Sequence, residues 1–123
     1  MNITILGAGA MGMLFGGYLS SRNDVWLLDV DRRRIGKIGL DGVKIREAEE
    51  DRIFYPHAVT SCEGLPKLDL VIVFVKAMYT VEALKANRAL IGGETRIMTL
   101  QNGAGHESKL LQFADPDHVI IGS

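Results

Sequence analysis

Three glycines near the start of the chain, Gly7, Gly9 and Gly12, have the spacing G-x-G-x-x-G. They follow a short apolar run, and a helix-like segment begins at about Ala10. In this setting the first glycine permits a tight turn, the second lets a pyrophosphate approach the backbone, and the third lets the helix pack on the strand. The free N–H groups of the helix start would face the phosphates. The motif therefore predicts a phosphate-binding turn; the alternative is a glycine-rich turn without a ligand.

An acidic residue, Asp29, stands at the end of a second apolar run and 22 residues after Gly7. A carboxylate at this place can accept a hydrogen bond from the adenosine ribose 2′-hydroxyl of NAD, and it repels the 2′-phosphate of NADP. Arg32 and Arg33 follow closely and could neutralise that phosphate, although a solvated helix face is the simpler interpretation. Asp29 therefore favours NADH as the cofactor.

Two polar residues stand just after later apolar runs. Lys76 comes at the end of residues 69–75, and its ammonium could reach the phosphates or ribose of a cofactor; a surface lysine is the alternative. Asn102 follows residues 95–100, and its amide could hold the nicotinamide ribose and donate to a substrate oxygen. Because Asn-Gly is a common turn pair, an ordinary turn is the alternative there.

Composition restricts the class of protein. The 123 residues suit one domain with a core, and the net charge of −1 gives no reason to expect a nucleic-acid or membrane partner. No apolar stretch approaches the roughly 20 residues needed to span a bilayer, and we expect no signal peptide. Cys62 is the single cysteine, which fits a reducing cytoplasm. The three histidines are far apart in the sequence, so we expect no metal site.

Apolar runs alternate with helical periodicity along the whole chain. The expected strands cover residues 2–6, 24–29, 43–46, 53–55, 57–60, 69–75, 95–100 and 118–122. The expected helices cover residues 10–21, 32–38, 80–90 and 107–113, with Gly36 and Gly39 keeping the second one short. This alternation predicts an α/β fold: a doubly wound, mostly parallel Rossmann-type sheet with helices on both faces.

Three segments together resemble the ketopantoate reductases (2-dehydropantoate 2-reductases). They are ILGAGAMG at the amino terminus, VFVKAMYT at 73–80 and LQNGAG at 100–105. The resemblance covers residues 1–123 as the family's dinucleotide-binding domain, and it implies that the family's C-terminal helical catalytic domain is absent. It also implies reduction of the ketone of 2-dehydropantoate to pantoate with NAD(P)H, a step of pantothenate and coenzyme A biosynthesis.

The resemblance assigns site residues in this chain. The implied pyrophosphate contacts are Gly7, Ala8, Gly9, Ala10, Met11 and Gly12. Lys76 would bind the adenosine side of the cofactor, and Asn102 would contact the nicotinamide and the keto-acid substrate. The family's general acid belongs to the second domain, so we expect this chain alone to bind cofactor without turnover. The family mostly uses NADPH and carries an arginine just after its second strand, where this chain has Asp29 and Asp31.

Two alternatives stay open. One is another β-hydroxyacid-type dehydrogenase with the same sheet and a different substrate. The other is a non-catalytic dinucleotide sensor, although Lys76 and Asn102 favour an enzyme. A domain without its partner domain would also expose apolar surface, through which a homodimer could form.

Overall fold

The structure is a computed structural model that describes residues 1–100 and 105–122. The strands are β1 (Asn2–Leu6), β2 (Asp24–Leu28), β3 (Val43–Glu47), β4 (Glu50–Phe54), β5 (His57–Val59), β6 (Leu70–Val73), β7 (Arg96–Thr99) and β8 (Val119–Ile121). The helices are α1 (Ala10–Ser20), α2 (Arg32–Asp41), α3 (Thr80–Ala86) and α4 (His106–Leu110). Short 3₁₀ turns cover Ala77–Tyr79, Arg88–Leu90 and Pro116–His118.

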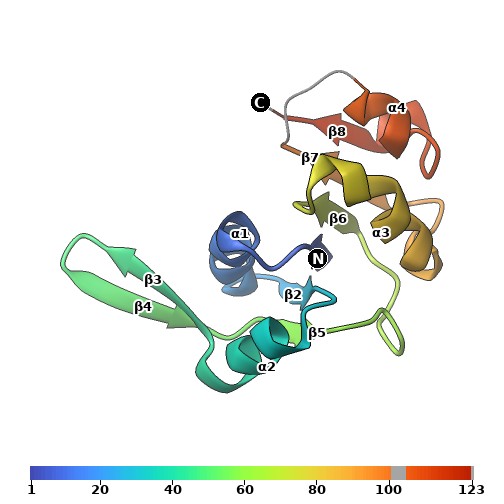
Figure 1. The fold of residues 1–123 in the computed structure, drawn as a ribbon. Coiled ribbons are helices and arrows are strands. Elements are labelled where there is room, and N and C mark those ends of the chain that lie inside the picture. The colour runs from blue at the N-terminus through green and yellow to red at the C-terminus, as the bar shows by residue number, and fades with distance from the viewer. Residues whose placement is uncertain (101–104, 123) are drawn as a thin grey trace.

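Within the described residues, six strands form one sheet in the order β5-β2-β1-β6-β7-β8 (Figure 1). Every pairing in this sheet is parallel. From β1 the chain first builds outwards through β2 to β5, and it then crosses to the other edge of β1 to add β6, β7 and β8. The strand order therefore reverses between β1 and β6, where doubly wound sheets form their ligand crevice. The predicted fold class is confirmed.

Each face of the sheet has its own apolar core. On one face, α1, α2 and the β3–β4 hairpin pack over alternate strand residues, including Ile3, Ile5 and Leu27. On the other face, α3 and α4 cover Leu6, Val71 and their neighbours. Figure 1 shows α1 on one side of the sheet and α3 and α4 on the other. Burial on both faces explains why these strands read as nearly continuous apolar runs.

Several element ends differ from the sequence prediction. The helix expected to stop at residue 38 continues to Asp41, because Ile35 and Ile38 are buried and the two glycines between residues 35 and 40 do not interrupt it. It ends at Gly42, whose φ of 73° is a left-handed conformation. The helix expected over 80–90 ends at Ala86, where the Asn87 side chain donates to the Ala83 carbonyl at 2.7 Å. The helix expected over 107–113 ends at Leu110.

The close contact between Gly12 in α1 and the glycine turn predicts that a methyl group added at residue 12 destabilises the fold. A Cβ on Gly12 would fall on the carbonyl oxygen of Gly7, well inside van der Waals contact, and this backbone atom cannot move aside cheaply. We expect Gly12→Ala to lower the free energy of unfolding by about 2–4 kcal/mol, measured by urea denaturation. Gly39→Ala is the matched control: it lies in α2 with open space around it, and it should raise stability by about 0.5–1 kcal/mol. A Gly12→Ala chain that unfolds at the wild-type urea concentration would contradict this packing.

Candidate dinucleotide-binding site

A cleft of about 710 Å³ opens at the carboxyl edge of the sheet, over the point where the strand order reverses. Its walls come from three segments: the turn after β1, the loop and first helical turn after β2, and the segment from the end of β6 through α3. The lining residues are Leu6, Gly7, Gly9, Leu28, Asp29, Val30, Arg34, Phe74, Val75, Lys76, Tyr79, Glu82, Ala83, Ala86 and Asn87. The cleft thus joins three sites that the sequence predicted separately: the glycine turn, Asp29 and Lys76.

The glycine turn packs closely against the sheet at Gly7 and leaves open space at Gly9. Gly7 has a φ of 105°, and a Cβ there would lie 2.9 Å from the Val75 nitrogen. Its own N–H donates to the Leu28 carbonyl at 2.9 Å, which fastens the turn to β2. By contrast, a Cβ on Gly9 would meet no atom within 4 Å. The space over Gly9 is what a pyrophosphate needs to approach the backbone, so the turn fits this group.

The helix α1 begins at this turn. Gly9 is its N-cap, and the first intrahelical bond runs from the Met13 N–H to the Gly9 carbonyl at 2.9 Å. The N–H groups of the first helical residues, which include Ala10 and Met11, have no partner inside a helix by its geometry. These donors and the positive end of the helix dipole suit an anion.

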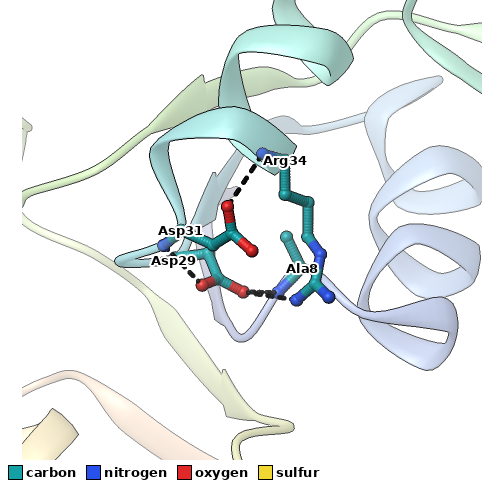
Figure 2. Close-up of polar contacts among 4 residues, drawn as sticks. All are labelled: Ala8, Asp29, Asp31 and Arg34. Carbon is teal, nitrogen blue, oxygen red and sulfur yellow. Dashed lines mark hydrogen bonds and ion pairs between the residues drawn. The ribbon is translucent and has the colours of Figure 1, made fainter.

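Asp29 accepts hydrogen bonds from three directions (Figure 2). Its Oδ2 atom accepts from the Ala8 backbone N–H at 2.8 Å and from Nη1 of Arg34 at 3.3 Å. Its Oδ1 atom accepts from the Asp31 backbone N–H at 2.9 Å. Asp31 in turn caps α2 by accepting from the Arg34 N–H at 3.0 Å. The acid at the end of β2 therefore ties the glycine turn to the start of α2.

These contacts set the charge state of Asp29. Burial raises the pKa of the carboxyl, but the N–H groups of Ala8 and Asp31 and the Arg34 guanidinium stabilise the charged form and bring the pKa below its usual range. The Asp29 side chain is 14% exposed, whereas that of Arg34 is 46% exposed. The carboxylate is thus well enclosed and negatively charged at neutral pH.

The structure adds contacts around Asp29 that the sequence did not predict. Asp29 lies in the cleft, as a ribose acceptor requires, and the N–H of Ala8, a residue that the resemblance assigns to the pyrophosphate, donates to this carboxylate. Arg32 and Arg33 are exposed and do not line the cleft. Of the arginines at 32–34, which the sequence offered together as possible contacts of a 2′-phosphate, only Arg34 lines the cleft in the described part of the chain. Its position follows from the Asp31 cap, which places residue 34 on the first turn of α2.

One wall of the cleft was not foreseen in the sequence. It is the face of the 3₁₀ turn and α3 that carries Tyr79, Glu82, Ala83, Ala86 and Asn87. These positions follow helical spacing after Lys76, which is the one signal in the sequence that could have indicated them.

Lys76 stands at the rim of the cleft and is exposed. The carbonyl of the next residue, Ala77, accepts a hydrogen bond from Nζ of Lys109 in α4 at 3.1 Å. This contact ties the segment after β6 to the helix that follows β7. Asn102 lies outside the described residues.

Away from the cleft, side chains of Asp115, Asp117 and His118 come within 4.8 Å of one another. Both acids are exposed, and His118 bonds to Asp117 at 3.2 Å. Such clusters are common on protein surfaces without a metal ion. In the part of the chain that the structure describes, no helix is both long and apolar enough to cross a bilayer.

The parallel sheet, its strand order and the glycine turn at its reversal point define a dinucleotide-binding domain of the Rossmann type. Residues 3–123 match the family profile "Ketopantoate reductase PanE/ApbA". The chain belongs to this family, which confirms the resemblance noted in its three sequence segments.

Individual relatives agree with this assignment. The chain is 34% identical to the 2-dehydropantoate 2-reductase of Streptococcus pyogenes serotype M1, covering 99% of this chain and 40% of that protein. The enzyme of the same name from Pyrococcus abyssi is 34% identical, covering 92% of this chain and 37% of that protein. The chain thus spans about 40% of the length of these relatives.

Solved structures show the same fold. D-mandelate dehydrogenase in a ternary structure with NADH and anilino(oxo)acetate has a TM-score of 0.88 and 32% identity, covering 100% of this chain and 40% of that chain. The 2-dehydropantoate 2-reductase from Geobacter metallireducens GS-15 has a TM-score of 0.81 and 31% identity, covering 98% of this chain and 40% of that chain.

The lowered pKa of Asp29 predicts how its contribution to stability depends on pH. A carboxyl with a lower pKa in the folded state than in the unfolded state stabilises the fold above the unfolded value of about 3.9. That contribution is lost as the pH falls through the lower, folded-state pKa. We expect Asp29→Asn to lower the free energy of unfolding by about 1 kcal/mol at pH 7, and the difference to shrink below about pH 4. Urea denaturation of both chains between pH 7 and pH 3 measures this, and a difference that grows towards low pH would contradict it.

Proposed function

We propose that this chain binds NAD(P)H and forms the cofactor-binding part of an oxidoreductase that reduces 2-dehydropantoate to pantoate. The observation that carries the proposal is the cleft that brings the glycine turn, Asp29 and Lys76 together where the strand order reverses. Membership in the ketopantoate reductase family supports the reaction, and the names of the relatives support the substrate. Pantoate formation would place the protein in pantothenate and coenzyme A biosynthesis, and a single cysteine supports a cytoplasmic location.

The residues of this chain would bind and orient the cofactor. The open backbone at Gly9 and the free N–H groups at the start of α1 would hold the pyrophosphate. Asp29 would accept from the adenosine ribose, and Lys76 would place a positive charge at the adenosine side. Asn102 would contact the nicotinamide end and the substrate, on the strength of the sequence resemblance. A reduced nicotinamide bound there would supply a hydride for the ketone carbon, and a general acid, which the sequence resemblance assigns to the family's second domain, would protonate the alkoxide.

The same observations favour NADH over NADPH. The Asp29 carboxylate is negatively charged and lies in the cleft, where it would repel a 2′-phosphate. The D-mandelate dehydrogenase relative was solved with NADH, which supports this preference. Arg34 also lines the cleft, but it is paired with Asp29 at 3.3 Å. A 2′-phosphate would therefore have to compete with that carboxylate for the guanidinium.

D-Mandelate dehydrogenase also supports a second candidate function, the reduction of a different 2-keto acid. Its identity to this chain is similar to that of the 2-dehydropantoate reductases, so the cofactor-binding part does not separate the two substrates. With either substrate, this chain would hold the dinucleotide. We propose that this chain by itself binds cofactor without turning over a keto acid.

Calorimetric titration of the chain with NADH and with NADPH tests the cofactor proposal. We expect NADH to bind at least about tenfold more tightly, which corresponds to about 1.4 kcal/mol. Tighter binding of NADPH would assign the 2′-phosphate to Arg34 or Lys76 and would reject Asp29 as a ribose acceptor. Binding of neither dinucleotide would contradict the proposed function of this chain.

Substitution of Lys76 tests its proposed contact with the adenosine side. We expect Lys76→Met to weaken NADH binding by about three- to tenfold, because an ammonium near the phosphates or ribose is lost. Lys85→Met is the matched control, since Lys85 is exposed on α3 and does not line the cleft. Equal affinity losses in the two variants would show a general charge effect and not a contact of Lys76.

A further inference from the structure

We propose that Asp29 is a positioning residue for the phosphate-binding turn, in addition to its expected role as a ribose acceptor. The carboxylate fastens Ala8 to the loop after β2 and thereby sets the backbone from which the pyrophosphate donors project. This inference rests on the proposed function, because it deepens the assignment of the same site. It makes the ribose and phosphate parts of the site depend on one side chain.

The first step of the argument is the number and origin of the donors. Asp29 receives hydrogen bonds from the turn after β1 (Ala8 N–H, 2.8 Å), from the loop after β2 (Asp31 N–H, 2.9 Å) and from the α2 side chain of Arg34 (3.3 Å). Two of the three donors are backbone groups, which cannot swing away as a side chain can. The carboxylate therefore holds two loops in a fixed relation (Figure 2).

The second step is the place of Ala8 in the turn. Gly7 is held by its N–H bond to the Leu28 carbonyl at 2.9 Å, and Ala8 is held by Asp29. Two successive residues of the turn are thus tied to the end of β2, and the next residue, Gly9, begins α1 beside open space. If Ala8 lost its hydrogen bond to Asp29, the turn would be less restrained just before the first backbone N–H groups of α1.

The third step is the capacity of the carboxylate. Its two oxygens offer about four acceptor directions, and the described contacts occupy three. One direction remains for a ribose hydroxyl. An asparagine at this position would have one acceptor oxygen, and its amide nitrogen would meet a backbone N–H that needs an acceptor. Asp29→Asn therefore weakens the tie to Ala8 or the tie to Asp31 even when no ligand is bound.

A binding experiment separates the two roles of Asp29. The probes are NADH and an NADH analogue whose adenosine ribose lacks both the 2′- and 3′-hydroxyls. A residue that acts only through the ribose would affect NADH alone, and Asp29→Asn would leave the analogue's affinity unchanged. We expect Asp29→Asn to weaken binding of the analogue as well, by about five- to tenfold. Unchanged affinity for the analogue would overturn the proposal.

Arg34→Met is the matched control in this experiment. It removes the longest of the three contacts, at 3.3 Å, and leaves the Ala8 N–H bond in place. Because Arg34 lines the cleft but does not hold Ala8, we expect Arg34→Met to weaken binding of the analogue less than Asp29→Asn does. An effect as large as that of Asp29→Asn would show that loss of the ion pair, and not release of the turn, weakens binding, and this would overturn the proposal.

A spectroscopic measurement on the free chain tests the tie to Ala8 without any ligand. The Ala8 amide proton resonance should move as Asp29 titrates in the wild-type chain, because its acceptor loses charge on protonation. Its hydrogen exchange should be at least about tenfold faster in Asp29→Asn and unchanged in Arg34→Met. An Ala8 resonance that does not follow the titration of Asp29 would overturn the proposal. These measurements need no cofactor. If NADH failed to bind, the proposed function would be rejected, but the measurements would still confirm or reject the hydrogen bond between Ala8 and Asp29.

Discussion

The arrangement of this domain depends on the pairing of β1 along both of its edges. It pairs in parallel with β2 on one side and with β6 on the other, and its residues Ile3 to Leu6 are almost completely buried. Because the three strands run in the same direction, the segments that follow them leave the sheet at the same edge. The glycine turn, Asp29 and Lys76 are far apart in the sequence and meet there for this reason.

Close packing then sets how these segments approach one another. Gly7 lies against the backbone of Phe74 and Val75, which follow β6, and Gly12 lies against the Gly7 carbonyl. These close contacts allow the chain to turn sharply and to begin α1 directly after the turn. The helix α1 thus starts at the turn whose Gly7 and Gly9 line the cleft, and the N–H groups of its first turn have no partner within the helix. Side chains have no room at Gly7 and Gly12, whereas the backbone at Gly9 is open, and this open backbone is where we propose that the pyrophosphate binds.

The charge of Asp29 depends on several groups around the cleft. The Asp29 carboxylate interacts with Ala8, Asp31 and Arg34, and the balance of these contacts over burial keeps it charged. Arg34, which is paired with Asp29, and Lys76 each supply a cation to the lining of the cleft. The cleft is therefore lined by two acids, the partly buried Asp29 and the exposed Glu82, and by two exposed cations, Arg34 and Lys76.

Much of the fold could be predicted from local pattern. Apolar runs such as residues 69–75 identified central strands, and glycine spacing identified the turn, because burial on two faces and close backbone approach restrict residue types strongly. Element ends were predicted less well. The glycines in α2 did not end that helix, because burial of Ile35 and Ile38 outweighs the low helix propensity of glycine.

The sequence by itself determined the fold class and the family, because periodicity, glycine spacing and the three matching segments are properties of the linear order of residues. Only the tertiary structure decided how the predicted site residues interact. It bonded the Ala8 N–H to Asp29, it brought Arg34 to the cleft in place of Arg32 and Arg33, and it added the α3 wall. Hydrogen bonds between loops depend on distances and directions across the sheet, and local sequence does not encode these until the strands have paired.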